Sequence, residues 1–183
     1  MRLFVRLHTA LIMLGAGSLV AVAITMARAA SFQESAAHAL EHRLSESASV
    51  AAPFDGGLIG RLEIPRLNVS VIVMEGDDDS TLARAVGHVP GTALPWDVGN
   101  AVIAGHRDTF FRPLKDIQLS DTIRFTTPEG TTEYRVISTK VVSPNDTWVL
   151  DENSPDTLTL VTCYPFYYIG PAPKRFIVQA EKN

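Results

Sequence analysis

Three side chains that can carry out nucleophilic chemistry stand at the ends of apolar runs in the second half of the sequence. Cys163 is the single cysteine of the 183 residues, and it closes the β-branched run LTLVTC. His106 follows the apolar run AVIAG, and Arg175 opens the run RFIVQAE. Such runs are typical of strands, and active sites gather where strands give way to loops. We therefore expect the sulfur, the imidazole and the guanidinium to meet in one solvent-reachable cleft.

This combination of residue types suits a cysteine nucleophile. Thiolate is the reactive form, and an unperturbed thiol is only about 3% ionised at pH 7, so Cys163 needs a base or an electropositive neighbour. His106 is the best candidate for that neighbour. Arg175 stays protonated at any relevant pH, so it cannot shuttle protons. It can instead hold a carbonyl oxygen and stabilise the negative charge of a tetrahedral intermediate.

Each of the three residues also has a purely structural interpretation. A free cysteine is often buried and packs as a small apolar side chain. A histidine in a turn can serve only as a hydrogen-bonding residue, and an arginine at the start of a strand is usually a solvated edge charge. Among the other histidines, His88 lies in the loop HVPGTALPWDVGN and is the one rival to His106 within the domain.

A second chemical pattern lies nearer the N-terminus. His38-Ala39-Leu40-Glu41-His42 matches the H-x-x-E-H pattern of inverted zinc peptidases, and on a helix both histidines would share a face. The segment offers no core and no evident third ligand, so a solvated helix face is the favoured interpretation. One cysteine also excludes an internal disulfide and a zinc site built from several thiolates.

The charge balance argues against nucleic acid as a partner. With 16 Lys and Arg against 20 Asp and Glu, the formal net charge is −4, which gives no basic footprint. The length predicts one domain with enough chain for a real hydrophobic core.

The N-terminus predicts a membrane anchor. Arg2 and Arg6 precede an uncharged run at residues 9–27, which as a helix would rise about 28 Å, close to the hydrocarbon thickness of a bilayer. The positive charge lies mainly before this run, so the start should stay cytoplasmic and the rest should be exported. Ala27-Arg28-Ala29 resembles a signal-peptide cleavage site, which is the alternative, but the apolar run is longer than usual for a signal peptide.

Three segments follow from this pattern. Residues 1–29 are predicted to form the cytoplasmic tip and transmembrane anchor. Residues 30–57 are predicted to form a partly helical juxtamembrane spacer that begins with a capping box at Ser31-x-x-Glu34. The apolar side chains of this spacer are mostly alanine, so it should bury little surface and hold the domain off the bilayer. Residues 58–183 are predicted to form the catalytic domain.

The pattern of residues 58–183 predicts a mainly β domain. Two short helical stretches are expected, at residues 79–86 with Asp79 or Ser80 as the cap, and at residues 111–117. Six to eight short strands separated by turn residues favour a β-barrel or a sandwich. The strand-like runs lie at residues 58–64, 68–74, 101–105, 121–127, 132–142, 158–163 and 175–181, with a hairpin turn at residues 128–130.

Three segments of the domain resemble the sortases, the cysteine transpeptidases of bacterial surfaces. Thr159–Cys163 matches the TLxTC signature of that family, AVIAGHRD is similar to its catalytic histidine segment, and PAPKRFIVQA places Arg175 where the family carries its arginine. The match covers roughly residues 58–183, and the N-terminal anchor also fits. The segments HRDTFFRPLKDI and TCYPFYYIGPAPKRF are most similar to class D-type sortases.

The resemblance implies an eight-stranded β-barrel with Cys163, His106 and Arg175 at one end. Cys163 would attack the threonine carbonyl of an LPxTG-like sorting signal to form a thioacyl enzyme, His106 would move the protons, and Arg175 would bind substrate or oxyanion. Thr162 and Tyr164 become candidates for substrate binding, Thr162 through a hydrogen bond near the oxyanion. The acidic residues of the calcium site of some class A sortases have no clear match, so no required metal and no cofactor is expected.

The resemblance also implies the partners and the compartment. They are an exported protein that bears a sorting signal, an amine nucleophile such as a peptidoglycan cross-bridge or a protein lysine, and a membrane on whose extracytoplasmic side the domain lies. Two alternatives remain. One is a hydrolase that uses water in place of the amine. The other is an exported non-catalytic β-barrel module that binds a partner, with Cys163 buried and inert.

Overall fold

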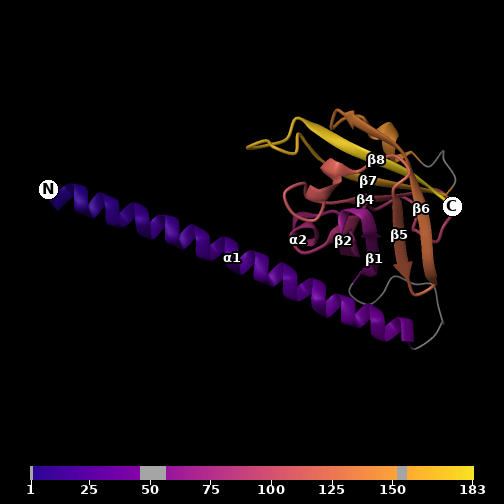
Figure 1. Ribbon diagram of the computed structural model, residues 1–183, viewed down its shortest axis with the longest axis horizontal. Helices are drawn as coiled ribbons and strands as arrows, with labels where there is room; N and C mark the ends of the chain where they lie inside the picture. The colour runs from indigo at the N-terminus through magenta and orange to yellow at the C-terminus, as the bar shows by residue number, and fades with distance from the viewer. Residues whose placement is uncertain (1, 46–56, 152–155) are drawn as a thin grey trace.

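A long N-terminal helix and a β-barrel make up the protein (Figure 1). The computed structural model describes residues 2–45, 57–151 and 156–183. Helix α1 spans Arg2–Ser45, and the barrel is built from the chain that follows Gly57. The barrel packs against the C-terminal end of α1, and the N-terminal half of the helix extends away from it (Figure 1).

Eight strands close into one barrel in the order β1-β2-β3-β4-β7-β8-β6-β5. This confirms the prediction of a mainly β fold and of an eight-stranded barrel. Strand β3 pairs in parallel with β2, and β4 in parallel with β7, whereas the other neighbours are antiparallel. The strands are β1 (Leu58–Ile64), β2 (Val69–Glu75), β3 (Val86–His88), β4 (Asn100–Ala104), β5 (Thr122–Thr127), β6 (Gly130–Val142), β7 (Thr157–Tyr164) and β8 (Lys174–Lys182).

Side-chain alternation determines which residues fill the barrel. Successive side chains of a strand point to opposite faces, so every second residue of a barrel strand points inward. In β4 and β7 the inward residues include Ile103, Leu158 and Leu160, which belong to the central core and are fully buried. The residues between them, such as Ala104 and Val161, therefore lie on the outer surface of the barrel.

Four short helical turns connect the strands: η1 (Pro65–Leu67), α2 (Asp79–Leu82), η2 (Arg112–Asp116) and η3 (Thr147–Leu150). The cap of α2 is Asp78, one residue earlier than expected, because its carboxylate accepts hydrogen bonds from the backbone amides of Ser80 and Thr81. Hydrogen bonds from these two residues, including those from their hydroxyls, lower the pKa of Asp78 to about 2.

Helix α1 differs from the predicted spacer in two ways. It runs through residue 31 without a break, so the expected capping box is wrong: the Ser31 hydroxyl donates to the carbonyl of Arg28. Its C-terminal part also buries more than its alanines suggested, because Leu40 is fully buried against Leu58, Ile72 and other side chains of the barrel. Residues 46–56 of the predicted spacer lie outside the described residues.

Polar contacts reinforce this docking. The Gln33 side chain donates to the carbonyl of Arg84 at 2.7 Å and accepts from the amide of Ile72 at 2.8 Å. Arg61 donates to Glu41 at 3.1 Å, and the Arg84 guanidinium lies 4.8 Å from the centre of the Phe32 ring. Residues 32–41 therefore pack on the barrel as part of its structure. The apolar half of α1 is exposed, and it is long and apolar enough to cross a membrane.

Candidate active site

Strand pairing places Cys163 directly opposite Arg175. Cys163 lies near the end of β7, and the antiparallel register of β7 and β8 pairs it with Arg175 at the start of β8. Side chains at directly opposed positions of an antiparallel pair share one face of the sheet and are close neighbours. Both side chains lie on the outer surface of the barrel, on the face that carries Val161 and Ile177. The sulfur is half-buried and free.

The parallel pairing of β4 and β7 brings His106 to the same place. Ala104 pairs with Val161, and the ladder continues beyond the strand because the Gly105 amide donates to the Val161 carbonyl at 3.1 Å. The Thr162 hydroxyl then donates to the Gly105 carbonyl at 2.7 Å. Both the amide and the carbonyl of Gly105 are thus hydrogen-bonded to β7. These bonds place the next residue, His106, beside the end of β7 that carries Cys163.

Gly105 is required for this arrangement by its packing. A Cβ atom at residue 105 would stand 2.6 Å from the ring of Phe111, which is fully buried below it. The Phe111 amide in turn donates to the His106 carbonyl at 3.1 Å, which closes the turn after His106. This turn leaves the imidazole exposed to solvent.

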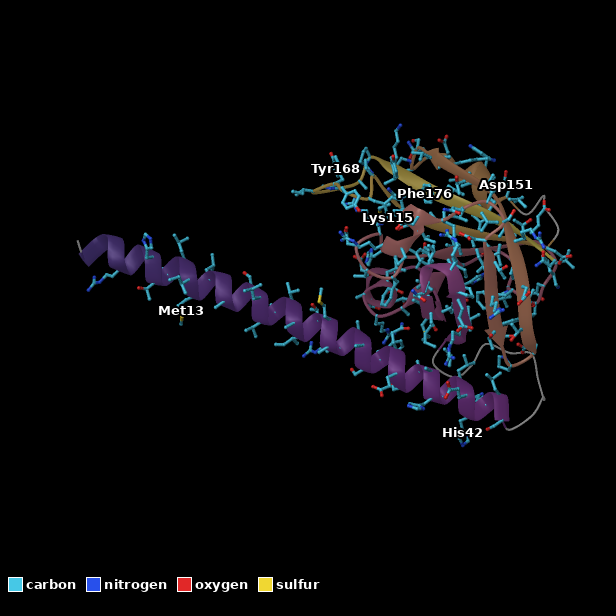
Figure 2. The ribbon with its side chains drawn as sticks, viewed as in Figure 1. Met13, His42, Lys115, Asp151, Tyr168 and Phe176 are labelled. Atoms are coloured by element: carbon cyan, nitrogen blue, oxygen red, sulfur yellow. The ribbon has the colours of Figure 1, made fainter. Side chains whose placement is uncertain are left out.

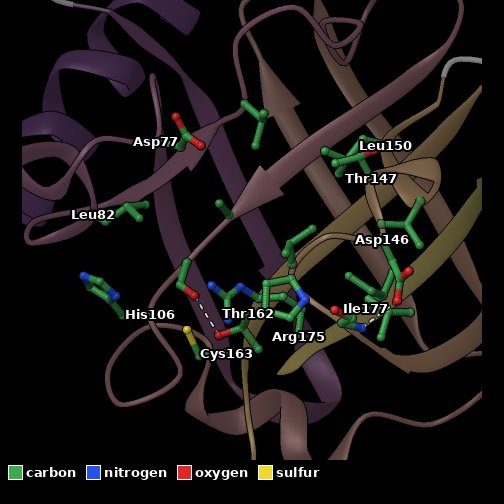
Figure 3. Close-up of a pocket in the computed structure, with 18 residues that line it drawn as sticks. Asp77, Leu82, His106, Asp146, Thr147, Leu150, Thr162, Cys163, Arg175 and Ile177 are labelled. Carbon is green, nitrogen blue, oxygen red and sulfur yellow. Dashed lines mark hydrogen bonds between the residues drawn. The ribbon is translucent and has the colours of Figure 1, made fainter. Parts of the chain in front are cut away.

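A pocket of about 370 Å³ joins the three residues. Cys163, His106 and Arg175 all contribute to its lining, and Figure 3 shows their side chains around the same opening. The volume is within the usual range for sites that bind a small molecule or a few residues of a peptide. The cysteine is thus at the end of a groove, in contact with solvent, and not in the core.

Most of the groove is apolar. Outward-facing side chains of three strands form its floor, namely Ala104, Val161 and Ile177. The connection between β6 and β7, which contains Val149 and Leu150, forms one wall, and Leu82 of α2 lies on another side with Val89. Two carboxylates, Asp77 and Asp146, also line it. The groove therefore suits an extended chain with apolar side chains that leads to the cysteine.

A family model for the sortase domain matches residues 62–183, which is about two thirds of the sequence. The chain belongs to the sortase family. Sortase D of Bacillus subtilis (strain 168) is 37% identical over 131 residues, and the match covers 71% of this chain and 66% of that relative. Sortase A of Listeria monocytogenes is 28% identical over 118 residues, or 62% of this chain and 53% of the relative. The chain thus spans no more than about two thirds of the length of these relatives.

Solved sortase structures share the fold. The structure of a Clostridium perfringens sortase D5 transpeptidase has a TM-score of 0.66 and 29% identity, and covers 84% of this chain and 96% of that one. Sortase A from Corynebacterium diphtheriae has a TM-score of 0.65 and 26% identity, with 85% and 84% coverage. The eight-stranded barrel is therefore the sortase fold.

The two predicted substrate-binding residues, Thr162 and Tyr164, both make contacts within the protein. Thr162 is buried and its hydroxyl donates to the Gly105 carbonyl, so it braces the segment that carries His106. Tyr164 is outside the pocket lining and packs with two other aromatic rings, 6.0 Å from Phe166 and 6.3 Å from Phe176 between centroids. Thr162 still contributes to the pocket lining, although neighbouring side chains of a strand point to opposite faces.

The rival histidine has a structural role. His88 belongs to β3 and is buried, with Nδ1 2.9 Å from a carboxylate oxygen of Glu75 and Nε2 2.9 Å from the Ala93 carbonyl. It is not among the residues that line the pocket. The next residue, Val89, does line the groove. The hydrogen bonds of the His88 ring therefore fix the backbone next to this part of the groove wall.

The H-x-x-E-H segment is part of the docked helix. Glu41 binds Arg61 of the barrel, and His38 lies 3.9 Å from Glu41. Within the described residues, no group of three or more His, Cys, Asp and Glu side chains is placed to hold a metal ion.

Arg107 is a residue of this region that sequence reasoning missed. It is buried although it follows the exposed His106, and its guanidinium donates to the carbonyls of Pro165 and Tyr168, both at 2.7 Å. These carbonyls belong to the connection between β7 and β8 that carries the chain from Cys163 to Arg175. In the sequence, an arginine in a polar segment such as this predicts a solvated surface charge. Only the tertiary structure shows that the Arg107 guanidinium donates to backbone carbonyls.

Proposed function

We propose that the protein is a membrane-anchored cysteine transpeptidase that cleaves an LPxTG-like sorting signal and joins the acyl part to an amine. The observation that carries this proposal is that Cys163, His106 and Arg175 line one pocket whose lining is mostly apolar. Membership of the sortase family supports the same reaction. An LPxTG-like peptide begins with two apolar residues, which match the apolar floor of the groove.

The reaction proceeds in two displacements on Cys163. The thiolate attacks the carbonyl carbon of the threonine, and the tetrahedral intermediate carries its negative charge near the Arg175 guanidinium. The carbon–nitrogen bond breaks as His106 gives a proton to the departing amine, which leaves a thioester. An incoming amine then attacks the thioester, His106 takes its proton, and the thiolate is released.

The membrane helix gives the enzyme its place in the cell. We infer that residues 9–27 cross the bilayer with the N-terminus in the cytoplasm, because Arg2 and Arg6 precede the apolar run. The barrel then lies on the extracytoplasmic side, where an exported protein with a sorting signal would meet it. The acceptor would be an amine of a peptidoglycan cross-bridge or of a protein lysine.

The non-catalytic alternative receives less support. It requires a buried and inert cysteine, whereas Cys163 is half-buried and lines the pocket. Hydrolysis by the same residues is the second candidate, because water can replace the amine at an exposed thioester.

The test uses the full chain in mild detergent with a library of LPxTG-type peptides, with and without triglycine. We expect cleavage between threonine and glycine, a triglycine adduct by mass spectrometry, and a thioester that hydroxylamine converts to a hydroxamate. Cys163→Ala should abolish all three while its melting temperature stays close to that of the natural chain. Cleavage by Cys163→Ala would overturn the nucleophile assignment, and free acid as the sole product with triglycine present would favour the hydrolase.

A further inference from the structure

The tip of the connection between β7 and β8 exposes three consecutive large hydrophobic side chains. Tyr167 is 75% exposed, Tyr168 is 45% exposed and Ile169 is fully exposed. An exposed cluster of this kind is informative, because soluble surfaces usually show such side chains one at a time. In the described part of the barrel the other exposed large hydrophobics do stand singly, namely Val98, Leu119, Ile137, Val141 and Trp148.

Buried and exposed arginines hold this tip in its outward position. Arg107 is 6% exposed and binds the Tyr168 carbonyl at 2.7 Å, with its guanidinium also 5.8 Å from the centre of the Tyr168 ring. Arg112 lies 5.8 Å from the centre of the Tyr167 ring. The exposure of the tip is therefore part of the ordered structure, since its backbone is fixed by a charged side chain inside the barrel end.

Helix α1 brings a bilayer close to the barrel. The apolar run ends at Ala27, and contact with the barrel begins at Phe32 and Gln33. Five residues of helix rise only about 7.5 Å, which is comparable to the roughly 5–8 Å headgroup layer of one leaflet. The docked helix leaves no extended spacer, so the side of the barrel that faces the N-terminus lies at the membrane surface.

The tip lies on that side. Figure 1 shows the connection between β7 and β8 projecting from the barrel in the direction of the N-terminal half of α1. Figure 2 places Tyr168 on this side and Asp151 on the opposite side of the barrel. The residues at the tip are absent from the lining of the groove, so the pocket does not explain their exposure.

We propose that Tyr167, Tyr168 and Ile169 insert into the interfacial layer of the leaflet in which the apolar run of α1 ends. Tyrosine is enriched at this depth because its ring is apolar and its hydroxyl remains hydrated, and isoleucine can reach the top of the acyl chains. Arg112, beside Tyr167, would face lipid phosphates. The barrel then rests on the bilayer at two points, α1 and the tip, which sets the tilt of the groove that ends at Cys163. This inference rests on the anchoring proposed above.

The test reads the depth of the tip in a membrane. Cys163→Ala combined with Ile169→Cys gives a full chain with one thiol, which is labelled with an environment-sensitive fluorophore. The chain is reconstituted into vesicles of phosphatidylcholine with a minor fraction of phosphatidylglycerol. We expect a blue-shifted emission and strong quenching by lipids that carry a nitroxide at the top of the acyl chain, as for a group about 5–10 Å into the headgroup and acyl boundary.

The matched control carries the label on the far side of the barrel. Cys163→Ala combined with Asp151→Cys should give the emission of a water-exposed label and little quenching. If the two labels behave alike and both remain aqueous, the insertion of the tip is refuted. Flotation of the same vesicles is measured first, because a chain that fails to float refutes the anchoring itself. Neither result depends on catalysis, which the Cys163→Ala background removes.

Discussion

The register of β7 and β8 places Cys163 and Arg175, which are distant in the sequence, where they can act together. They are twelve positions apart in the chain, yet the antiparallel pairing of β7 and β8 sets them directly opposite each other. The guanidinium also donates to the carbonyls of Ala172 and Lys174, at 3.3 and 3.1 Å, which orients it at the start of β8. A positive charge on the residue paired with Cys163, in the same pocket, suits the stabilisation of a developing oxyanion.

The role of Arg175 can be measured against its neighbour. Arg175→Ala should lower kcat/KM for an LPxTG-type peptide by about 10²–10³-fold, the effect of losing one oxyanion donor. Lys174→Ala is the control, because Lys174 is exposed and its position on β8 faces the opposite way. Equal losses in both variants would point to a general effect of positive charge at this end of the barrel.

A second residue-scale prediction concerns acid stability. Asp121 is 7% exposed, and its carboxylate accepts from Arg66 at 2.6 Å and from the Gln118 amide at 2.8 Å. The hydrogen bond from Arg66 is the main reason that the pKa of Asp121 lies below its ordinary value of 3.8. Its contribution to stability is therefore complete above pH 3.8 and is lost as the pH falls through the lower pKa of the folded state.

Asp121→Asn should lower the free energy of unfolding at pH 7 by about 1.5–3 kcal/mol, the range for a hydrogen bond to a charged group. The loss should shrink as the pH falls below about 4, because the natural carboxylate is then protonated as well. Thermal melts of the full chain in detergent at several pH values measure both effects. Asp116→Asn is the control: Asp116 is exposed and pairs with Lys115 at the surface, so about 0.5 kcal/mol or less is expected.

At the scale of elements, the connection between β7 and β8 depends on a residue from another strand end. Arg107 follows β4, and its guanidinium binds the carbonyls of Pro165 and Tyr168 and approaches that of Gly170 at 3.4 Å. These contacts fix the path of the chain that leads out of Cys163 and back into Arg175. We regard Arg107 as a positioning residue, because it holds the connection between β7 and β8 and does not line the pocket.

Arg107→Ala should lower the melting temperature, because the carbonyls of Pro165 and Tyr168 lose a charged donor in part-buried hydrogen bonds worth about 1 kcal/mol or more each. It should also lower kcat more than it raises KM, since the geometry around Cys163 loosens while the groove remains. Arg107→Lys keeps the charge without the planar fork, so we expect only partial recovery of kcat. Arg112→Ala removes an exposed cation of η2 that contacts the same connection through the Tyr167 ring, and it should leave kcat unchanged. A comparable loss of kcat in this variant would contradict the positioning role of Arg107.

At the scale of the whole molecule, α1 and the barrel form one body. The side of α1 that includes Phe32, Ala36 and Leu40 covers an apolar patch on β1 and β2 that contains Leu58, Ile72 and Met74. Without the helix these side chains would face water. Helix α1 therefore also completes the surface of the domain.

Leu40→Ala should weaken the docking of α1 by about 2–4 kcal/mol, because it removes a fully buried side chain and leaves a cavity. Hydrogen exchange in the full chain measures the effect at the Ile72 amide, which donates to the Gln33 side chain. We expect faster exchange at that amide in Leu40→Ala. Leu44→Ala, at a 40% exposed position of the same helix, should leave the exchange rate unchanged. Unchanged protection in Leu40→Ala would mean that docking does not depend on this contact.

Local pattern was enough to predict the elements that depend on neighbouring residues. The apolar run of residues 9–27, the alternating strands and the hairpin at residues 128–130 follow from periodicity and turn chemistry, which act over a few residues. The family motifs around Cys163, His106 and Arg175 indicated the site for the same reason. The pattern failed for the part of α1 that packs on the barrel. Its alanine-rich sequence predicted little buried surface, whereas Leu40 is fully buried against β1 and β2.

What the sequence by itself determined is thus seven of the eight strands, the class of the barrel and the three residues that the structure gathers around one pocket. It missed β3, because Val86 was assigned to a helix that in fact ends at Leu82. The tertiary structure alone decided that the three residues share one pocket, that the Thr162 hydroxyl binds Gly105, that Arg107 is buried, and that α1 docks on β1 and β2. These facts depend on pairings between residues tens of positions apart. Such pairings are selected by the packing of the closed barrel as a whole, and no short window of sequence contains both partners.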